Sequence, residues 1–246
     1  DGFDPWHHVW LFATQMGGNL ISTDGKTAQL DSSIAVEATA FWLDWMGKYG
    51  IASHQNATFA GADMYKYFGA GNAAMAAMVG AGAISSLKTS AVAHEYDWAV
   101  DPLVPYGDSK MPSGGKAVAG FSGGQFLCLF KYSPNQQQAL NVIKVLTSPE
   151  IQHDFFTLYA QMPVKLDVYK KYPDTKKHPW DTLFDIQEKA VSLPFITSWG
   201  ELETLIGQVV NQMATQIATG NGYKMNDLRS ALHAANVKLQ AQLNGG

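Results

Sequence analysis

Hydrophobic positions recur at the helical period in several segments of this chain, which predicts a fold rich in helices. The first long segment follows Asp31 and Ser32, either of which can serve as the N-cap, and it stops at Gly50. Two further long helices are predicted near the end of the chain, over residues 201–218 and 226–243. The apolar positions of the first segment are Ile34, Ala38, Phe41, Trp42, Trp45, Met46 and Tyr49.

The middle of the chain has a different pattern. Residues 126–130 are apolar without helical spacing and follow a glycine-rich turn, which is typical of a short buried strand. Two helices are predicted directly afterwards, because Ser133 and Ser148 are good N-caps and each precedes a proline. Proline is favoured at the first helical position, where its missing N–H leaves no hydrogen bond unmade. The pattern therefore predicts a strand followed by two helices.

Shorter elements complete the expected order. Residues 4–10 are predicted to be an extended entry into a short helix that ends at residues 16–18. A hairpin is predicted over residues 19–31 with its turn at residues 23–26. Further strands are expected over residues 73–78 and 96–104. Strands and helices together predict an α/β fold for the chain.

The composition of the chain argues against several classes of function. The chain has 246 residues, of which 46% are hydrophobic, so it can form a sizeable core. Its net charge is −4 and Arg229 is its only arginine, which argues against a nucleic-acid-binding surface. No apolar run approaches the roughly 20 residues that a transmembrane helix requires. The adjacent pair His7 and His8 is a poor metal-binding set, because neighbouring residues point in different directions. No metal or cofactor is expected.

One ordered set of features resembles a known family. A glycine pair at 123 and 124 precedes the apolar run, a polar turn follows, and the helical segment 139–152 leads on to Met162 and Pro163. This order resembles the extracellular solute-binding proteins of ABC importers, within the sugar-binding family that includes the maltodextrin-binding protein. The resemblance can be followed from Trp10 to the last helix, and the order of the motifs makes it specific.

The resemblance implies a fold and a domain division. It implies an α/β, two-lobed fold of the type II periplasmic-binding-protein kind. In relatives, a stretch on the order of 100 residues or more precedes the position where this sequence starts. We therefore expect the chain to lack most of the N-terminal lobe. Residues 1–116 and 172–246 would form the C-terminal lobe, and residues 117–171 would be a remnant of the other lobe.

The resemblance also implies a ligand cleft. A sugar ring has an apolar C–H face on which an indole can stack, and a rim of hydroxyls that polar groups can bind. Relatives carry tryptophans at the positions of Gly82 and Gln125, and residues 121–125 are expected at the cleft. Each aromatic candidate could instead fill a core. The candidate ligand-binding residues are Trp6, His7, Trp10, Gly82, Gln125 and Trp199, the last of which we expect in a loop and as the stacking anchor.

The function implied by the resemblance is transport without chemistry. The protein would capture a mono- or oligosaccharide outside the cytoplasmic membrane, in the periplasm or lipid-anchored at the surface of a Gram-positive cell. It would deliver this ligand to the permease subunits of an ABC transporter, as a monomer when full length. The alternative is a carbohydrate-active enzyme or its non-catalytic sugar-binding module. A glycosidase needs two facing carboxylates, and Asp4, Glu201 and Glu203, the acids near the expected cleft, lie in no recognisable catalytic context.

Overall fold

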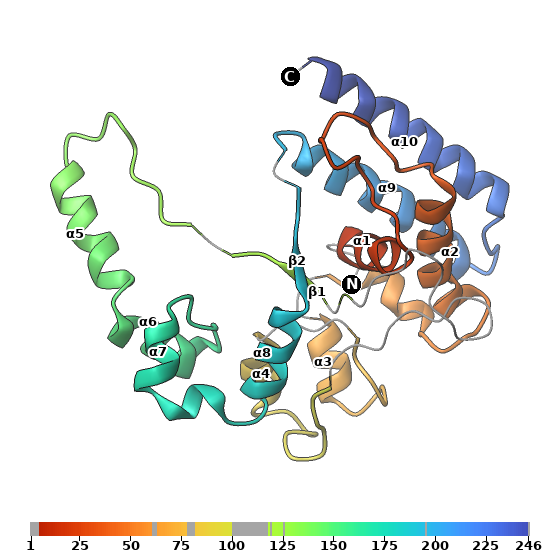
Figure 1. Cartoon of the computed structure of the whole chain (residues 1–246). Coiled ribbons are helices and arrows are strands. Elements are labelled where there is room, and N and C mark those ends of the chain that lie inside the picture. The colour runs from red at the N-terminus through yellow and green to blue at the C-terminus, as the bar shows by residue number, and fades with distance from the viewer. Residues whose placement is uncertain are drawn as a thin grey trace. The chain divides into compact units, whose positions relative to one another are not determined.

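The computed structural model describes residues 5–60, 63–77, 82–99, 118, 120–124, 126–194 and 196–245. Within these residues most elements are helices, and the one sheet consists of two short strands, β1 and β2 (Figure 1). The helices are α1 (Trp6–Gln15), α2 (Ser33–Gly47), α3 (Asp63–Gly69), α4 (Gly82–Leu87), α5 (Gln136–Leu146), α6 (Pro149–Tyr159), α7 (Leu166–Lys171), α8 (Trp180–Glu188), α9 (Trp199–Ala218) and α10 (Met225–Gly245). Two 3₁₀-helices, η1 (His54–Thr58) and η2 (Pro173–Lys176), and the strands β1 (Gly120–Ser122) and β2 (Ala190–Ser192) complete the order.

The chain forms two compact units. The first comprises Asp1–Met64, Pro102–Phe121 and Lys189–Gly246, and the second comprises Tyr65–Asp101 and Ser122–Glu188. These bounds differ from those of the predicted lobes, 1–116, 117–171 and 172–246, and the lobe division stays a prediction.

The core of the first unit lies between α1, α2, α9 and α10, which contact one another. Residues three or four positions apart on a helix share one face, so a stripe of apolar residues becomes a buried surface when helices pack. On α9 the buried stripe is Leu202, Leu205, Ile206, Val209, Val210, Met213, Ala214 and Ile217, and on α10 it is Leu228, Leu232, Ala235 and Leu239. The predicted helices over residues 201–218 and 226–243 are therefore confirmed.

Helix α2 begins as the sequence predicted. Ser32 is the N-cap, and its hydroxyl accepts a hydrogen bond from the backbone N–H of Ala35 at 3.2 Å. This bond satisfies one of the N–H groups that the first turn of a helix leaves without an internal partner. The small residues of the helix, such as Ala38, face the core, while the larger Phe41 and Trp45 are only half-buried.

Replacing Ser32 with Ala should lower the free energy of unfolding by about 1 kcal/mol, because the first turn loses this cap. The matched control is Ser33→Ala, which alters an exposed residue inside the helix. That change should alter stability by no more than about 0.5 kcal/mol, because alanine favours helix more than serine does. Urea unfolding of both variants measures the difference, and equal effects would argue against the capping role.

The predicted hairpin is present as a short ribbon joined to α10. Ile21 and Ala28 form an antiparallel bridge, and Gly25 adopts a left-handed φ of 71° in the turn. Side chains of α10 bind the outer backbone of this ribbon. The amide oxygen of Gln240 accepts a hydrogen bond from Ala28 N at 2.9 Å, and that of Asn236 accepts one from Leu30 N at 2.8 Å. Gln240 also donates to the carbonyl of Lys26 at 2.9 Å.

In the second unit, helix α6 has a well-formed cap at each end. Ser148 caps it by accepting a hydrogen bond from Ile151 N, and Pro149 occupies its first turn, both as predicted. The helix stops at Ala160, whose φ of 57° is left-handed. Gln152 is buried, and its side-chain oxygen accepts hydrogen bonds from the backbone N–H groups of residues 164 and 165. These two hydrogen bonds connect α6 to the loop that follows it.

Several predicted elements of the second unit are wrong. Residues 126–130 form no strand and most of them are exposed, because no neighbouring strand pairs with them within the described residues. Ser133 does not cap α5. Its hydroxyl accepts from Asn135 N in a turn, and the helix starts at Gln136. Residues 73–77 and 96–99 also lack strand structure, while residue 78 and residues 100–104 lie outside the described residues.

Candidate functional site

Three of the predicted ligand-binding residues form an aromatic cluster in the first unit. The ring of Trp6 lies edge-on to Trp199 at a centroid distance of 5.4 Å and contacts His7 at 4.0 Å. Phe121, on β1, lies 5.4 Å from Trp6 and 4.8 Å from His7. Trp6, His7, Phe121 and Trp199 are called the aromatic cluster below. Helix α1, strand β1 and helix α9 lie far apart in the sequence, and the fold brings their residues together in this cluster.

The aromatic residues in and beside the cluster differ in how much of their side chains is exposed. Trp6 is only 4% exposed and Trp10, which lies edge-on to Phe121 at 6.1 Å, is only 1% exposed. His7, Phe121 and Trp199 are half-buried. The half-buried members can offer ring surface to a ligand, whereas Trp6 and Trp10 support them from the core.

The sequence predicted that Trp199 lies in a loop. This prediction is wrong, because Trp199 is the first residue of α9. Ser198 stands at the N-cap position of α9, but its side chain makes no capping hydrogen bond. The indole Nε1 of Trp199 is buried, and no residue among those described accepts a hydrogen bond from it. An indole N–H normally finds a partner when it is buried, so this donor is an exception to that rule within the described residues.

Next to the cluster, His8 has a structural position. Its ring stacks on Trp42 at 4.4 Å with an interplanar angle of 9°. Desolvation by burial is the main reason that the pKa of His8 is lowered to about 3, so the ring is neutral at physiological pH. Across the described parts of the chain, no group of three or more His, Cys, Asp or Glu residues is arranged to hold a metal ion.

The remaining candidates lie elsewhere. Gly82 is the first residue of α4 in the second unit, and a Cβ at this position would meet no atom within 4 Å. Gln125 lies outside the described residues. Phe121 was not predicted to bind ligand, although the sequence placed residues 121–125 at the cleft. Whether these residues bind ligand stays a prediction.

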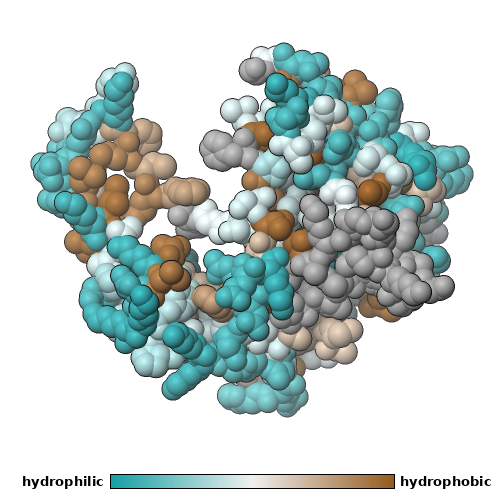
Figure 2. Space-filling view, viewed as in Figure 1, coloured by the Kyte–Doolittle hydropathy of each residue, from teal (hydrophilic) through white to brown (hydrophobic). Residues whose placement is uncertain are grey.

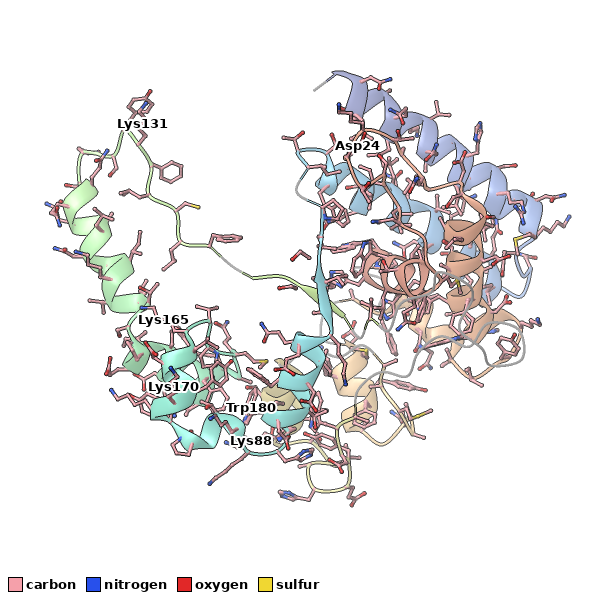
Figure 3. The ribbon with its side chains drawn as sticks, in the orientation of Figure 1. Asp24, Lys88, Lys131, Lys165, Lys170 and Trp180 are labelled. Carbon is pink, nitrogen blue, oxygen red and sulfur yellow. The ribbon has the colours of Figure 1, made fainter. Side chains whose placement is uncertain are left out.

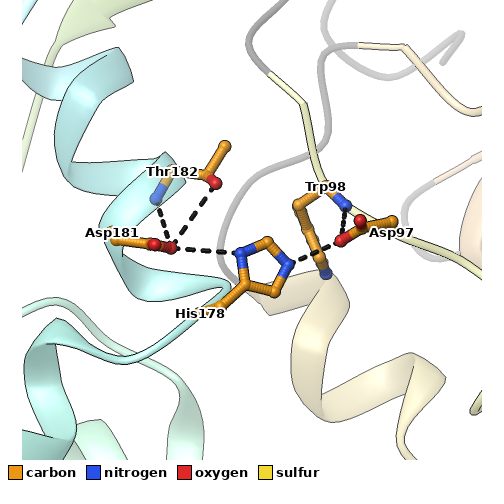
Figure 4. Close-up of polar contacts among 5 residues, drawn as sticks. All are labelled: Asp97, Trp98, His178, Asp181 and Thr182. Carbon is orange, nitrogen blue, oxygen red and sulfur yellow. Dashed lines mark hydrogen bonds and ion pairs between the residues drawn. The ribbon is translucent and has the colours of Figure 1, made fainter.

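A polar cluster in the second unit centres on His178 (Figure 4). Its Nε2 lies 2.5 Å from a carboxylate oxygen of Asp97, and its Nδ1 lies 3.1 Å from one of Asp181. A neutral imidazole has one N–H, so only the protonated ring can donate to both carboxylates. The pKa of His178 is accordingly raised, chiefly by its hydrogen bond to Asp97. The cluster offers charge pairing between two segments of this unit.

Replacing Asp97 with Asn should lower the pKa of His178 towards its ordinary value. Because the folded pKa is raised, the pairing stabilises the fold below the unfolded pKa, and this contribution is lost as the pH rises through the folded pKa. NMR titration of the ring protons of His178 measures the shift. The control Asp181→Asn should lower the pKa less, because Asp97 makes the larger contribution. An unchanged titration in the Asp97 variant would contradict the pairing.

The fold matches solved structures of sugar-binding proteins. The chain is similar to the maltose-bound MalE3 protein of T. maritima, with a TM-score of 0.71, 21% identity, and coverage of 95% of this chain and 56% of the other. It is also similar to the maltose-maltodextrin-binding protein of Alicyclobacillus acidocaldarius, with a TM-score of 0.72, 16% identity, and coverage of 96% and 60%. A third match is an ABC transporter solute-binding protein of Thermotoga lettingae bound to α-D-tagatose, with a TM-score of 0.69, 21% identity, and coverage of 94% and 56%. These matches confirm the predicted class, the two-lobed binding-protein fold, and the chain spans less than two thirds of the length of each.

The family can also be stated. The profile described as bacterial extracellular solute-binding protein matches residues 3–184, which is more than half of the chain. The chain therefore belongs to this family, as the order of its motifs suggested. The comparison with curated proteins gave no match. Among the helices of the described residues, none combines the length and the apolar character that a membrane span needs.

Proposed function

We propose that this chain is part of the substrate-binding component of an ABC importer, and that it captures a carbohydrate for delivery to the permease. The observation that carries this proposal is the aromatic cluster in a member of the extracellular solute-binding family. Binding would take place outside the cytoplasmic membrane, in the periplasm or at the cell surface. The proteins with similar structures include a maltose-bound and a tagatose-bound member, which supports a sugar as the ligand class.

The half-buried rings of Trp199, His7 and Phe121 would form the apolar platform for the sugar. An aromatic ring can stack on the apolar C–H face of a sugar, while polar groups bind its rim of hydroxyls. Gly82 and Gln125 stand where relatives have tryptophans, so the platform would be smaller than in those relatives. This favours a ligand that is shorter or more polar than a long maltodextrin.

The protein would perform no chemistry on its ligand. Glu201 and Glu203 are two positions apart on α9, so their side chains point in different directions from the helix, whereas the two carboxylates of a glycosidase face one bond. A ligand that binds the closed form of a two-lobed protein better than the open form would shift the population towards closure.

A panel of maltose, maltotriose, D-glucose and D-tagatose tests the proposal on the protein that contains this chain. At a concentration of about 100 times Kd, a bound sugar should stabilise the fold by about 2.7 kcal/mol, which appears as a higher Tm. Chromatography of the same samples should show intact sugars. Released products would overturn the transport function in favour of an enzyme, and a panel without any thermal shift would argue against these sugars as ligands.

A further inference from the structure

The dipeptide Asn–Gly occurs twice in this chain, at residues 221–222 and 244–245. In such a pair the backbone nitrogen of the glycine can attack the side-chain Cγ of the asparagine and close a five-membered succinimide ring. Glycine favours this attack because it has no Cβ and its backbone reaches many conformations. The attack also requires that the glycine N–H is not held in a hydrogen bond. The fold therefore decides which of the two pairs can react.

The first pair follows the end of α9. Gly220 has a left-handed φ of 82°, and its N–H donates to the carbonyl of Ile217 at 3.0 Å. The N–H of Asn221 donates to the carbonyl of Gln216, also at 3.0 Å. These are the two hydrogen bonds of a Schellman motif, which ends the helix here. They leave the next N–H, that of Gly222, without an acceptor among the described residues.

Gly222 also has space around it. It is exposed, its φ of 63° is left-handed, and a Cβ at this position would meet no atom within 4 Å. Asn221 is exposed as well, and its Nδ2 donates to the hydroxyl of Thr219 at 3.2 Å. Water can replace such an exposed hydrogen bond at little cost, so the side chain of Asn221 can turn towards the nitrogen of Gly222.

The second pair is held in a helix. Gly245 belongs to α10, in which each backbone N–H donates to the carbonyl four residues earlier. The side-chain oxygen of Asn244 accepts a hydrogen bond from Gln240 at 2.9 Å. Ring closure at this pair therefore requires that the end of the helix opens first. Both pairs are exposed, and hydrophilic residues predominate over α10 in Figure 2, so backbone structure and not access of water distinguishes them.

We propose that Asn221 is a site of spontaneous deamidation, a covalent modification that requires no enzyme. The nitrogen of Gly222 bonds to Cγ of Asn221, and the side-chain amide nitrogen leaves as ammonia together with the proton of the Gly222 N–H. Water then adds to one carbonyl carbon of the succinimide, and the C–N bond at that carbon breaks. Cleavage at the side-chain carbonyl gives aspartate, and cleavage at the backbone carbonyl gives isoaspartate. No atom is oxidised or reduced, and either product carries a new carboxylate.

The modification changes a turn between two core helices. Either product places a negative charge at the C-terminal end of α9, where the helix dipole makes such a charge unfavourable. Isoaspartate also adds a CH₂ group to the main chain before Tyr223, whose hydroxyl donates to Asp44 on α2 at 2.7 Å. The turn connects α9 with α10, which pack on each other in the first unit. Deamidation should therefore lower the Tm of the protein.

Peptide mapping by mass spectrometry, after incubation of the protein that contains this chain in mildly alkaline buffer, tests the proposal. Deamidation raises the mass of a peptide by one mass unit, and chromatography separates its aspartate and isoaspartate forms. Asn221 should react faster than Asn244 by about tenfold or more, the ratio that corresponds to about 1.4 kcal/mol for opening the end of α10. In urea the two asparagines should react at similar rates, because unfolding removes the difference in backbone structure.

Three variants connect the reaction to stability. Asn221→Gln keeps the amide but would have to close a six-membered ring, which is much slower, so this variant should keep its Tm during the incubation. The matched control Asn244→Gln should lose Tm as the unchanged protein does. Asn221→Asp carries the new charge from the start, and its Tm should be lower by about 1–4 °C.

Two outcomes would overturn the proposal. Equal rates at Asn221 and Asn244 in the folded protein would show that the fold does not select between the pairs. An Asn221 that reacts in urea but stays intact in the folded protein would show that the turn protects it. Neither readout involves a sugar, so both are independent of the test of the proposed function.

Discussion

Replacing Trp10 with Ala should lower the free energy of unfolding by about 3–5 kcal/mol, the range for truncating a large buried aromatic residue. Trp10 is 1% exposed and lies on α1, which packs against both α2 and α9. Its removal would therefore leave a cavity where three helices of the first unit meet. Urea unfolding of the variant and the unchanged protein measures the effect.

The control Trp10→Phe separates ring volume from hydrogen bonding. Phenylalanine keeps much of the ring, so its cost should be well below that of alanine. The indole Nε1 of Trp10 is buried without a partner among the described residues, so its loss breaks no hydrogen bond in the structure. A loss of less than about 1 kcal/mol for the Ala variant would contradict the place of Trp10 in the core.

Replacing Trp199 with Ala should weaken sugar binding tenfold or more, which corresponds to about 1.4 kcal/mol. The reason is that Trp199 would be the stacking anchor, and the positions of Gly82 and Gln125 provide no second indole. Its effect on Tm should be much smaller than that of Trp10→Ala, because Trp199 is only half-buried. Calorimetry on the protein that contains this chain, with the best sugar of the panel, measures Kd.

Trp180 provides the matched control. It too is a half-buried tryptophan at the first position of a helix, α8, and it packs on Phe156 at 4.3 Å in the second unit (Figure 3). Trp180→Ala should leave Kd unchanged. If Trp199→Ala instead leaves Kd unchanged and lowers Tm strongly, Trp199 is a core residue and the candidate site is misplaced.

The elements that the sequence predicted well are those that local information defines. Ser32 and Ser148 cap their helices because the hydroxyl and the N–H that it accepts from are three residues apart. The apolar periods of α9 and α10 identify both helices without knowledge of their partners. The hairpin follows in the same way from a turn that accommodates the left-handed φ of Gly25.

The elements that it predicted poorly depend on distant partners. Residues 126–130 have the composition of a strand, but a strand forms only when another strand supplies its hydrogen bonds. The burial of Trp6 and Trp10 depends on Phe121 and on α9, which no local pattern reveals. Both residues were open to a core role in the sequence, whereas the helical position of Trp199 was missed.

In the contact between α10 and the small hairpin, the side chains of the helix have nearly the same spacing as the backbone N–H groups that they bind. Asn236 and Gln240 are four residues apart on a helix, which corresponds to a rise of about 6.0 Å. The two amides they bind, at Ala28 and Leu30, are two residues apart along an extended strand, a distance of about 6.6–6.8 Å. The side-chain amides of α10 are thus spaced almost as the backbone hydrogen-bonding groups of a neighbouring strand would be. With this edge already occupied, the ribbon does not offer it as a template to which another chain could add.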